Sequence, residues 1–150
     1  MSRPTPRKWY PKNPEKYMGD IKNIVARSSW EIKTLNWLDS NQNVLYYSSE
    51  EIAIPYFSPV DNRMHRYFPD FLARMKTKDG TIKTYLIEVK PSKERFLPTT
   101  KNKKQFLLEM CTYTVNQAKW AAAEAFCKIK NICFIVIDEY DLSIKKSPKQ

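Results

Sequence analysis

Histidine and cysteine are scarce in this sequence, and their scarcity excludes several kinds of site. The 150 residues include one histidine, His65, and three cysteines, which form no C-x-x-C pair. A structural zinc site needs four Cys or His ligands in local clusters. An odd number of irregularly spaced cysteines favours free thiols in a reducing compartment. The sequence therefore argues against a zinc site, and it excludes any reaction that needs several histidines.

Long hydrophobic runs are also missing. The longest clean run covers residues 132–137, whereas a membrane-spanning helix needs about 20 apolar residues. The first nine residues contain Arg3, Arg7 and Lys8 but lack the apolar core of a secretory signal. We therefore expect no membrane span and a cytosolic location.

Acidic residues are too few to balance the basic ones. Lys and Arg number 26 against 16 Asp and Glu, which gives a net charge of +10. This excess suggests a polyanionic partner, because basic residues that neutralise phosphates release condensed counterions. An anionic membrane would suit the same charge, but no basic amphipathic helix supports that interpretation.

The length predicts a single domain over residues 1–150. A basic arm with four prolines covers about residues 1–20, and a short basic tail covers about 143–150. The aromatic residues of the arm could stack on bases, but we favour their docking on the domain. The predicted elements are a helix over 28–40, extended segments over 44–47 and 51–56, a polar loop over 58–64, strands over 67–77 and 81–90, a helix over 106–130 and a strand over 132–138. This order predicts a mixed α/β domain with one central sheet.

Two predicted strands, 67–77 and 81–90, bring three charged residues together. If residues 78–80 form a three-residue loop, Asp70 lies opposite Glu88. A two-residue turn would instead place Asp70 opposite Lys90. Side chains alternate along a strand, so Glu88 and Lys90 share a face in either register.

Opposed carboxylates repel each other unless something offsets their charge. A divalent cation is the simplest candidate, because Mg²⁺ binds a few carboxylates and keeps positions for water and a phosphate oxygen. Lys90 could then position the attacking water or compensate charge in the transition state. The alternative is a solvated strand face on which Asp70, Glu88 and Lys90 form ordinary ion pairs.

Pro69-Asp70 and Glu88-Val89-Lys90, with 17 residues between the two acids, resemble the motif of the PD-(D/E)xK nuclease superfamily. The order of predicted elements is similar to its restriction-endonuclease-like core, which is a helix, a three-stranded meander, a second helix and a strand. The resemblance implies a nuclease that depends on Mg²⁺, with Mn²⁺ as a substitute. Asp70, Glu88 and the Val89 carbonyl would bind the metal, and Lys90 would assist catalysis.

The resemblance also suggests contributions from the two helices. Many members add a metal-binding glutamate from the first helix, and Glu31 matches it. Glu31 also fits a capping box with Ser28, which alone would explain it. Some members use a polar residue of the second helix, for which Lys119 is the candidate beside Asn116 and Gln117. The segment lacks the tyrosine of the Gln-x-x-x-Tyr motif, which argues against a processive exonuclease.

The whole chain resembles the head completion nucleases of phages with contractile tails. The similarity includes residues 9–14, 27–31, 66–71 and 87–91. It implies an endonuclease, with exonuclease activity left open, that trims or cuts packaged double-stranded DNA so that filled heads can join tails. Phage head and neck proteins would be its partners, in the host cell cytoplasm or in the virion. The expected DNA-binding residues are Arg66, Lys93, Arg95, Lys101, Lys103 and Lys104. The alternatives are a noncatalytic DNA-binding or neck-assembly protein and a junction resolvase.

Overall fold

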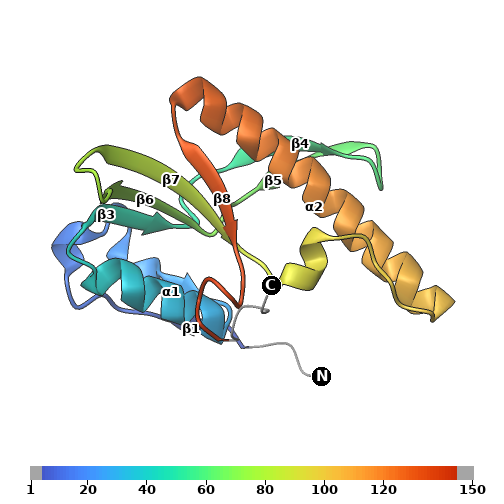
Figure 1. Ribbon diagram of the computed structural model, residues 1–150, viewed down its shortest axis with the longest axis horizontal. Helices are drawn as coiled ribbons and strands as arrows, with labels where there is room; N and C mark the ends of the chain where they lie inside the picture. The colour runs from blue at the N-terminus through green and yellow to red at the C-terminus, as the bar shows by residue number, and fades with distance from the viewer. Residues whose placement is uncertain (1–4, 145–150) are drawn as a thin grey trace.

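A four-stranded sheet forms the centre of the computed structural model, which describes residues 5–144. Its strands are β3 (Val44–Ser49), β6 (Phe71–Lys76), β7 (Ile82–Val89) and β8 (Cys133–Ile137), in the order β3-β6-β7-β8. The first three are antiparallel, and β8 runs parallel to β7. Helix α1 (Ser29–Ser40) precedes this sheet, and α2 (Lys103–Lys130) lies between β7 and β8 in the chain (Figure 1). This arrangement confirms the predicted mixed α/β domain with its restriction-endonuclease-like order of elements.

The register of β6 and β7 is the one that the three-residue loop predicts. Phe71 pairs with Ile87 and Leu72 with Leu86. The Thr77 amide donates to the Thr81 carbonyl at 2.8 Å, which closes the loop. Asp70 lies one residue before β6 and outside the paired residues, next to the Phe71–Ile87 pair.

Alternation along β7 divides the hydrophobic core between the two faces of the sheet. Ile87 packs with Leu35 of α1 and Phe71 in one cluster. Leu86 packs with Trp120 and Cys127 of α2 in a second cluster. Because each helix buries one face, β7 is a central strand, and its residue Glu88 lies in the interior. This argues against the solvated strand face considered above.

The sequence predicted an extended segment over 51–56, part of which is a strand, but it missed the hairpin that this strand forms between β3 and β6. The hairpin is formed by β4 (Ile54–Ser58) and β5 (Arg63–Tyr67), which pair antiparallel. The predictions of a polar loop over 58–64 and of one strand over 67–77 are therefore wrong. The burial pattern explains the error, because four of the five β5 residues are exposed and only Tyr67 is buried. A strand with one apolar inward residue has no readable alternation.

The predicted second helix begins earlier than expected, at Lys103, because the Asn102 side chain accepts a hydrogen bond from the Gln105 amide at 3.0 Å and caps it. Lys103 and Lys104 thus belong to the first turn of α2. The connection before it contains a short 3-10 helix, η3 (Ser92–Arg95).

The N-terminal arm docks on the domain, as expected. It contains β1 (Arg7–Lys8), which pairs with β2 (Val25–Ala26), and the 3-10 helix η1 (Pro14–Lys16). A second 3-10 helix, η2 (Ile21–Asn23), follows the arm. The buried ring of Tyr17 lies 5.3 Å from that of Tyr47. The Lys16 ammonium donates to three carbonyls at the C-terminal end of α1, where the helix dipole favours a cation.

Two further expectations concern the basic C-terminal tail and the lack of a membrane-spanning helix. The predicted tail over 143–150 falls largely outside the described residues, which end at 144. Within residues 5–144, neither helix has the length and hydropathy to cross a membrane.

Candidate active site

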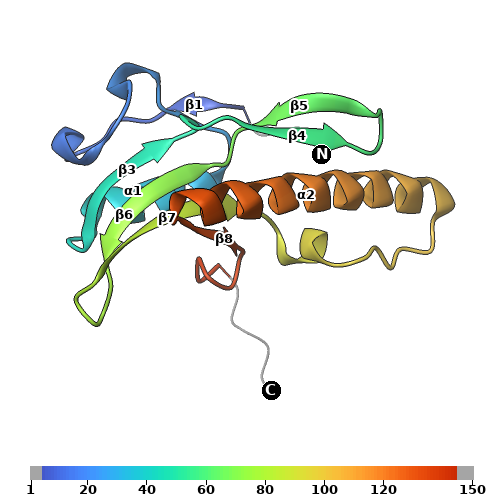
Figure 2. The same ribbon diagram turned by 90° about the horizontal axis from the view of Figure 1, so that it is seen from above.

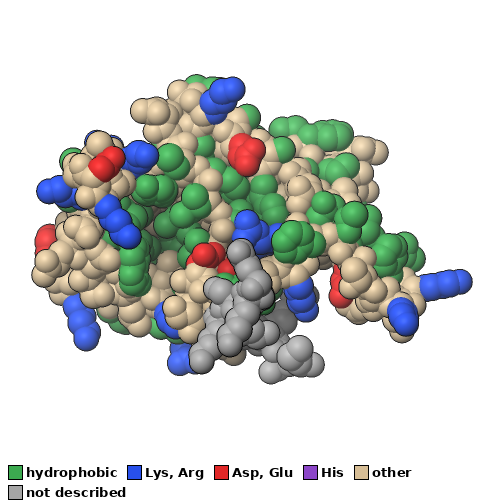
Figure 3. Space-filling view, in the orientation of Figure 1, with side chains coloured by type: hydrophobic (Ala, Val, Ile, Leu, Met, Phe, Trp, Pro, Cys, Tyr) green, Lys and Arg blue, Asp and Glu red, His purple; other side chains and the backbone are tan. Residues whose placement is uncertain are grey.

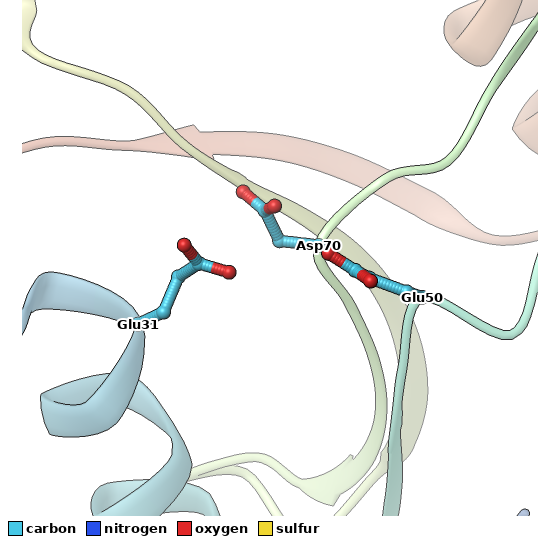
Figure 4. A group of neighbouring side chains, drawn as sticks. All are labelled: Glu31, Glu50 and Asp70. Atoms are coloured by element: carbon cyan, nitrogen blue, oxygen red, sulfur yellow. The ribbon is translucent and has the colours of Figure 1, made fainter. Parts of the chain in front are cut away.

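Three carboxylates meet where β3 ends and β6 begins. They are Glu31 of α1, Glu50 directly after β3 and Asp70 directly before β6 (Figure 4). One oxygen of each lies within 4.8 Å of the others. Carboxylate oxygens at such spacing are the ligands that a hard divalent cation prefers. The residues therefore fit the metal that the resemblance implies, and Glu50 joins the ligand candidates.

Backbone geometry and hydrogen bonds hold the carboxylates of Glu50 and Asp70 in place. Glu50 has a φ of 54°, in the left-handed region, and its amide donates to the Asp70 carbonyl at 3.0 Å. The Arg27 guanidinium contacts the Glu50 carboxylate at 2.9 and 3.3 Å. Asp70 Oδ2 accepts the Val89 amide at 2.8 Å. These bonds fix the ends of β3, β6 and β7 relative to one another.

Glu31 takes part in the cap of α1 and also belongs to the acidic group. Its amide donates to Ser28 Oγ at 3.2 Å, so Ser28 caps α1. Ser28 Oγ in turn lies 3.1 Å from Glu31 Oε2. The capping interaction does not withdraw Glu31 from the acidic group, because its side chain still faces Asp70 and Glu50 (Figure 4).

Glu88 is buried on the α2 side of the sheet and does not belong to the group of three carboxylates. The Tyr67 hydroxyl donates to Glu88 Oε2 at 2.5 Å. Lys90 Nζ lies 3.8 Å from Glu88 Oε1. Asp70 thus belongs to the group with Glu31 and Glu50 and also interacts electrostatically with Glu88 and Lys90. The structure brings the predicted motif residues together around Asp70.

Burial and mutual repulsion control the charge of this site. Burial and the neighbouring Glu88 charge raise the pKa of Asp70 well above its usual value. Burial also raises the pKa of Glu31. It raises the pKa of Glu88, although the Tyr67 hydrogen bond and the Lys90 and Lys119 charges oppose this effect. A bound cation would relieve this repulsion.

Lys119 reaches the site from α2. Its ammonium lies 5.6 Å from the centre of the Tyr67 ring and 5.9 Å from that of Tyr56. Burial and the nearby Lys90 charge lower its pKa. Of the other two candidates on this helix, Gln117 is exposed, as a solvated face predicts, and Asn116 is buried.

The predicted DNA-binding residues lie in separate places. Lys93, Lys101, Lys103 and Lys104 are exposed on the connection and the first turn of α2. Arg95 contacts the Asp138 carboxylate at 3.1 Å, so part of its charge is already compensated. Arg66 lies on the hairpin, with its guanidinium 5.6 Å from the centre of the Phe68 ring. Hydrophobic side chains gather beside the basic end of α2 (Figure 3).

Sequence reasoning missed Glu50 and Tyr67 as members of the site. Glu50 belongs to no spaced motif, and only the chain reversal after β3 turns it toward Asp70. Tyr67 stands close to Pro69-Asp70 in the sequence, but its contact with Glu88 depends on the unpredicted strand β5. Because β5 has no readable alternation, only the closeness of Tyr67 to Pro69-Asp70 in the sequence could have pointed to it.

The comparisons with known proteins agree with this geometry. Residues 41–139 match the family described as TnsA-like endonuclease N terminal. The head completion nuclease of Enterobacteria phage T4 is 39% identical over 138 residues, which cover 88% of this chain and 89% of the phage protein. Both findings confirm the resemblance that the motif indicated. The chain therefore belongs to the nuclease family of TnsA-like endonuclease domains, together with the head completion nuclease of phage T4.

Proposed function

We propose that this nuclease hydrolyses phosphodiester bonds of double-stranded DNA with the help of Mg²⁺, for which Mn²⁺ can substitute. The observation that carries the proposal is the position of Asp70, which groups with Glu31 and Glu50 and interacts electrostatically with the Glu88–Lys90 pair. No other part of the chain within residues 5–144 gathers three such ligands.

Each residue of the site has a separate role in this proposal. Asp70, Glu31 and Glu50 hold the divalent ion, with Glu88 and the Val89 carbonyl as the further ligands that the family motif implies. When bound, the ion supplies Lewis-acid stabilisation of the phosphate and a more acidic water. Lys90 positions the attacking water and compensates negative charge as it develops on the phosphate. Lys119 stabilises the same charge from α2.

The protein contacts DNA through the sugar–phosphate backbone, and such contacts carry no sequence information. Lys93, Lys101, Lys103 and Lys104 are exposed and free to contact phosphates along one part of the surface, and Arg66 contacts them along another. Arg95 contributes less, because Asp138 compensates its charge. The protein would then cut DNA without sequence preference, with endonuclease activity first and exonuclease activity in addition.

The 39% identity to a protein named head completion nuclease supports a biological setting for this activity. We propose that the chain processes packaged DNA during phage head completion, in the host cell cytoplasm or in the virion. Phage head and neck proteins would recruit it to filled heads.

Cleavage of supercoiled plasmid with and without Mg²⁺ tests the proposed activity. We expect the parent to nick or linearise the circle, and Asp70→Asn and Lys90→Ala to lose at least about 100-fold in rate. Asp79→Asn, an exposed carboxylate in the β6–β7 loop, is the matched control and should cleave like the parent. Equal cleavage by Asp70→Asn would refute the assignment.

Two further measurements separate the alternatives. A noncatalytic DNA-binding or neck-assembly protein would bind plasmid but show no Mg²⁺-dependent cleavage at all. A junction resolvase would cut four-way junctions far faster than linear duplex. A rise in the thermal unfolding midpoint with Mg²⁺, present in the parent and reduced in Asp70→Asn, tests metal binding independently of cleavage.

A further inference from the structure

The β4–β5 hairpin begins and ends at the active site. The chain leaves the central sheet after Glu50 and returns to it at Asp70, so two carboxylates of the site lie at the base of the hairpin. The hairpin extends alongside α2, away from the central sheet (Figure 2). The hairpin is therefore directly connected to the site at both of its ends.

One face of the hairpin is fixed against α2. Ile54, Tyr56 and Tyr67 point inward and belong to the core cluster that contains Trp120. The His65 ring stacks on the Tyr56 ring, with a centroid distance of 5.7 Å. Because these contacts hold the hairpin in place, its opposite face is a preformed surface.

The outward residues of this hairpin are almost entirely apolar. Phe57 is 52% exposed and pairs across the strands with Met64, which is 63% exposed. The next outward pair is Pro55 and Arg66, and Phe68 follows with 45% of its surface exposed. Arg66 is the one charged residue of this set, which we call the outer hairpin face: Pro55, Phe57, Met64, Arg66 and Phe68.

Exposed aromatic rings beside an arginine match the chemistry of unpaired nucleic-acid bases. A contiguous exposed apolar surface usually marks a contact site. Sheet faces that bear aromatic residues stack two or three bases of a single strand, and arginine adds cation–π and phosphate contacts. A DNA duplex already stacks its bases internally and offers no base face to such a surface. A second copy of this chain, with the same net charge of +10, is a less suitable occupant.

The outer hairpin face is also continuous with the site. Phe68 is separated from Asp70 only by the buried Pro69. The Arg66 guanidinium lies over the Phe68 ring, 5.6 Å from its centre. It would therefore lie beside a base that stacks on Phe68. A base placed on Phe68 would bring its own phosphate toward the acidic group.

We propose that the outer hairpin face binds a short unpaired segment of DNA through base stacking, so that the nuclease engages single-stranded ends or flaps next to the duplex that it cuts. This inference rests on the proposed nuclease function and names a feature of its substrate. Phe57 and Phe68 supply the stacking surfaces, and Arg66 supplies the cation.

Fluorescence anisotropy of the full chain in EDTA tests the inference, with a short labelled oligothymidine and a duplex of the same length as probes. We expect Phe57→Ala to weaken binding of the oligothymidine about tenfold relative to the duplex. Phe57→Leu, which stays apolar without an aromatic face, should lose a similar factor, and Phe57→Trp should restore binding. Leu107→Ala is the control, because Leu107 is 65% exposed on α2, outside this face.

Three results would overturn the inference: unchanged binding of oligothymidine by Phe57→Ala, an equal loss in Leu107→Ala, or full binding by Phe57→Leu. Phe68 lies outside both strands of the hairpin. Phe68→Ala therefore repeats the test if a variant within the strands fails to fold. Because no divalent ion is present, this binding result is independent of the plasmid cleavage that tests the nuclease assignment.

Discussion

The Tyr67 hydroxyl donates a hydrogen bond of 2.5 Å to Glu88 Oε2 in the interior between β5 and β7. Burial and the Glu88 charge raise the pKa of Tyr67 far above its usual value, so the hydroxyl keeps its proton and remains a donor. This bond fixes one oxygen of Glu88, while the other faces Lys90 at 3.8 Å. Tyr67 is thus a positioning residue for the predicted metal ligand.

Tyr67→Phe removes this donor and keeps the ring. We expect the rate of cleavage to fall about 10- to 100-fold, as is typical when a partner that orients a metal ligand is lost. The Mg²⁺ concentration for half-maximal cleavage should rise, while the affinity for DNA stays unchanged. Steady-state kinetics across a Mg²⁺ titration measures both effects.

Tyr56→Phe is the control for this variant. Tyr56 packs under the same Lys119 ammonium, but its hydroxyl makes no hydrogen bond to Glu88 in the part of the chain that the structure describes. A similar loss in both variants would indicate general damage to the core, and it would contradict the role given to Tyr67.

Glu50→Gln tests the acidic residue that the motif does not contain. Neutralising one of three neighbouring carboxylates should weaken Mg²⁺ binding about tenfold or more, because the ligand set loses a charge. Isothermal titration with Mg²⁺ of the parent and of the variant measures this affinity.

Glu51→Gln is the neighbouring control. Glu51 lies outside the acidic group and contacts Tyr17 and the Asp20 amide on the exposed side of the chain. We expect its Mg²⁺ affinity to equal that of the parent. If Glu50→Gln also binds Mg²⁺ like the parent, Glu50 is no ligand.

Lys101, Lys103 and Lys104 lie together at the N-terminal end of α2 and are exposed. If they contact phosphates, their joint replacement by Gln should reduce the slope of log affinity against log salt by about 2.7, because each phosphate contact contributes about 0.9. DNA binding in EDTA at several salt concentrations measures the slope. The control variant replaces Lys76, Lys78 and Lys128, which are exposed elsewhere on the surface, by Gln. It loses the same charge, and its slope should change less.

Tyr17 gives the docked arm a dependence on alkaline pH. Burial raises the pKa of Tyr17 to about 12, whereas an unfolded tyrosine has a pKa of about 10. Between these values the unfolded state has released a proton that the native state retains, so the free energy of unfolding falls as pH rises. The contribution of the buried Tyr17 phenol to the free energy of unfolding is fully present below a pH of about 10. It is lost as the pH rises to about 12, by no more than about 1.4 kcal/mol per pH unit.

Urea unfolding at pH of about 9 and about 11 measures this effect. We expect the stability advantage of the parent over Tyr17→Phe to shrink at the higher pH. Tyr10→Phe, at a side chain that is 67% exposed, should keep a constant difference from the parent. A constant difference for Tyr17→Phe would show that the phenol is not buried in solution.

The sequence alone determined the composition of the motif and the face that its residues share. The loop with Gly80 allowed two registers of β6 and β7, of which the structure has the one with the three-residue loop, and the alternation of β7 separated Ile87 from Leu86 and Glu88. These features depend on residues close together in the chain, so local turn geometry and the period of a strand are enough to predict them. The capping box of Ser28 and Glu31 is local in the same sense.

Tertiary structure decided which other side chains share the site. Glu50 joins Asp70 and Glu31 because β3 ends beside the start of β6, and Tyr67 reaches Glu88 because an inserted hairpin packs on α2. Both contacts join segments that are distant in the sequence. The pairing of β3 with β6 selects the first contact, and the packing of the hairpin on α2 selects the second. These long-range contacts have no local period that a sequence pattern could display.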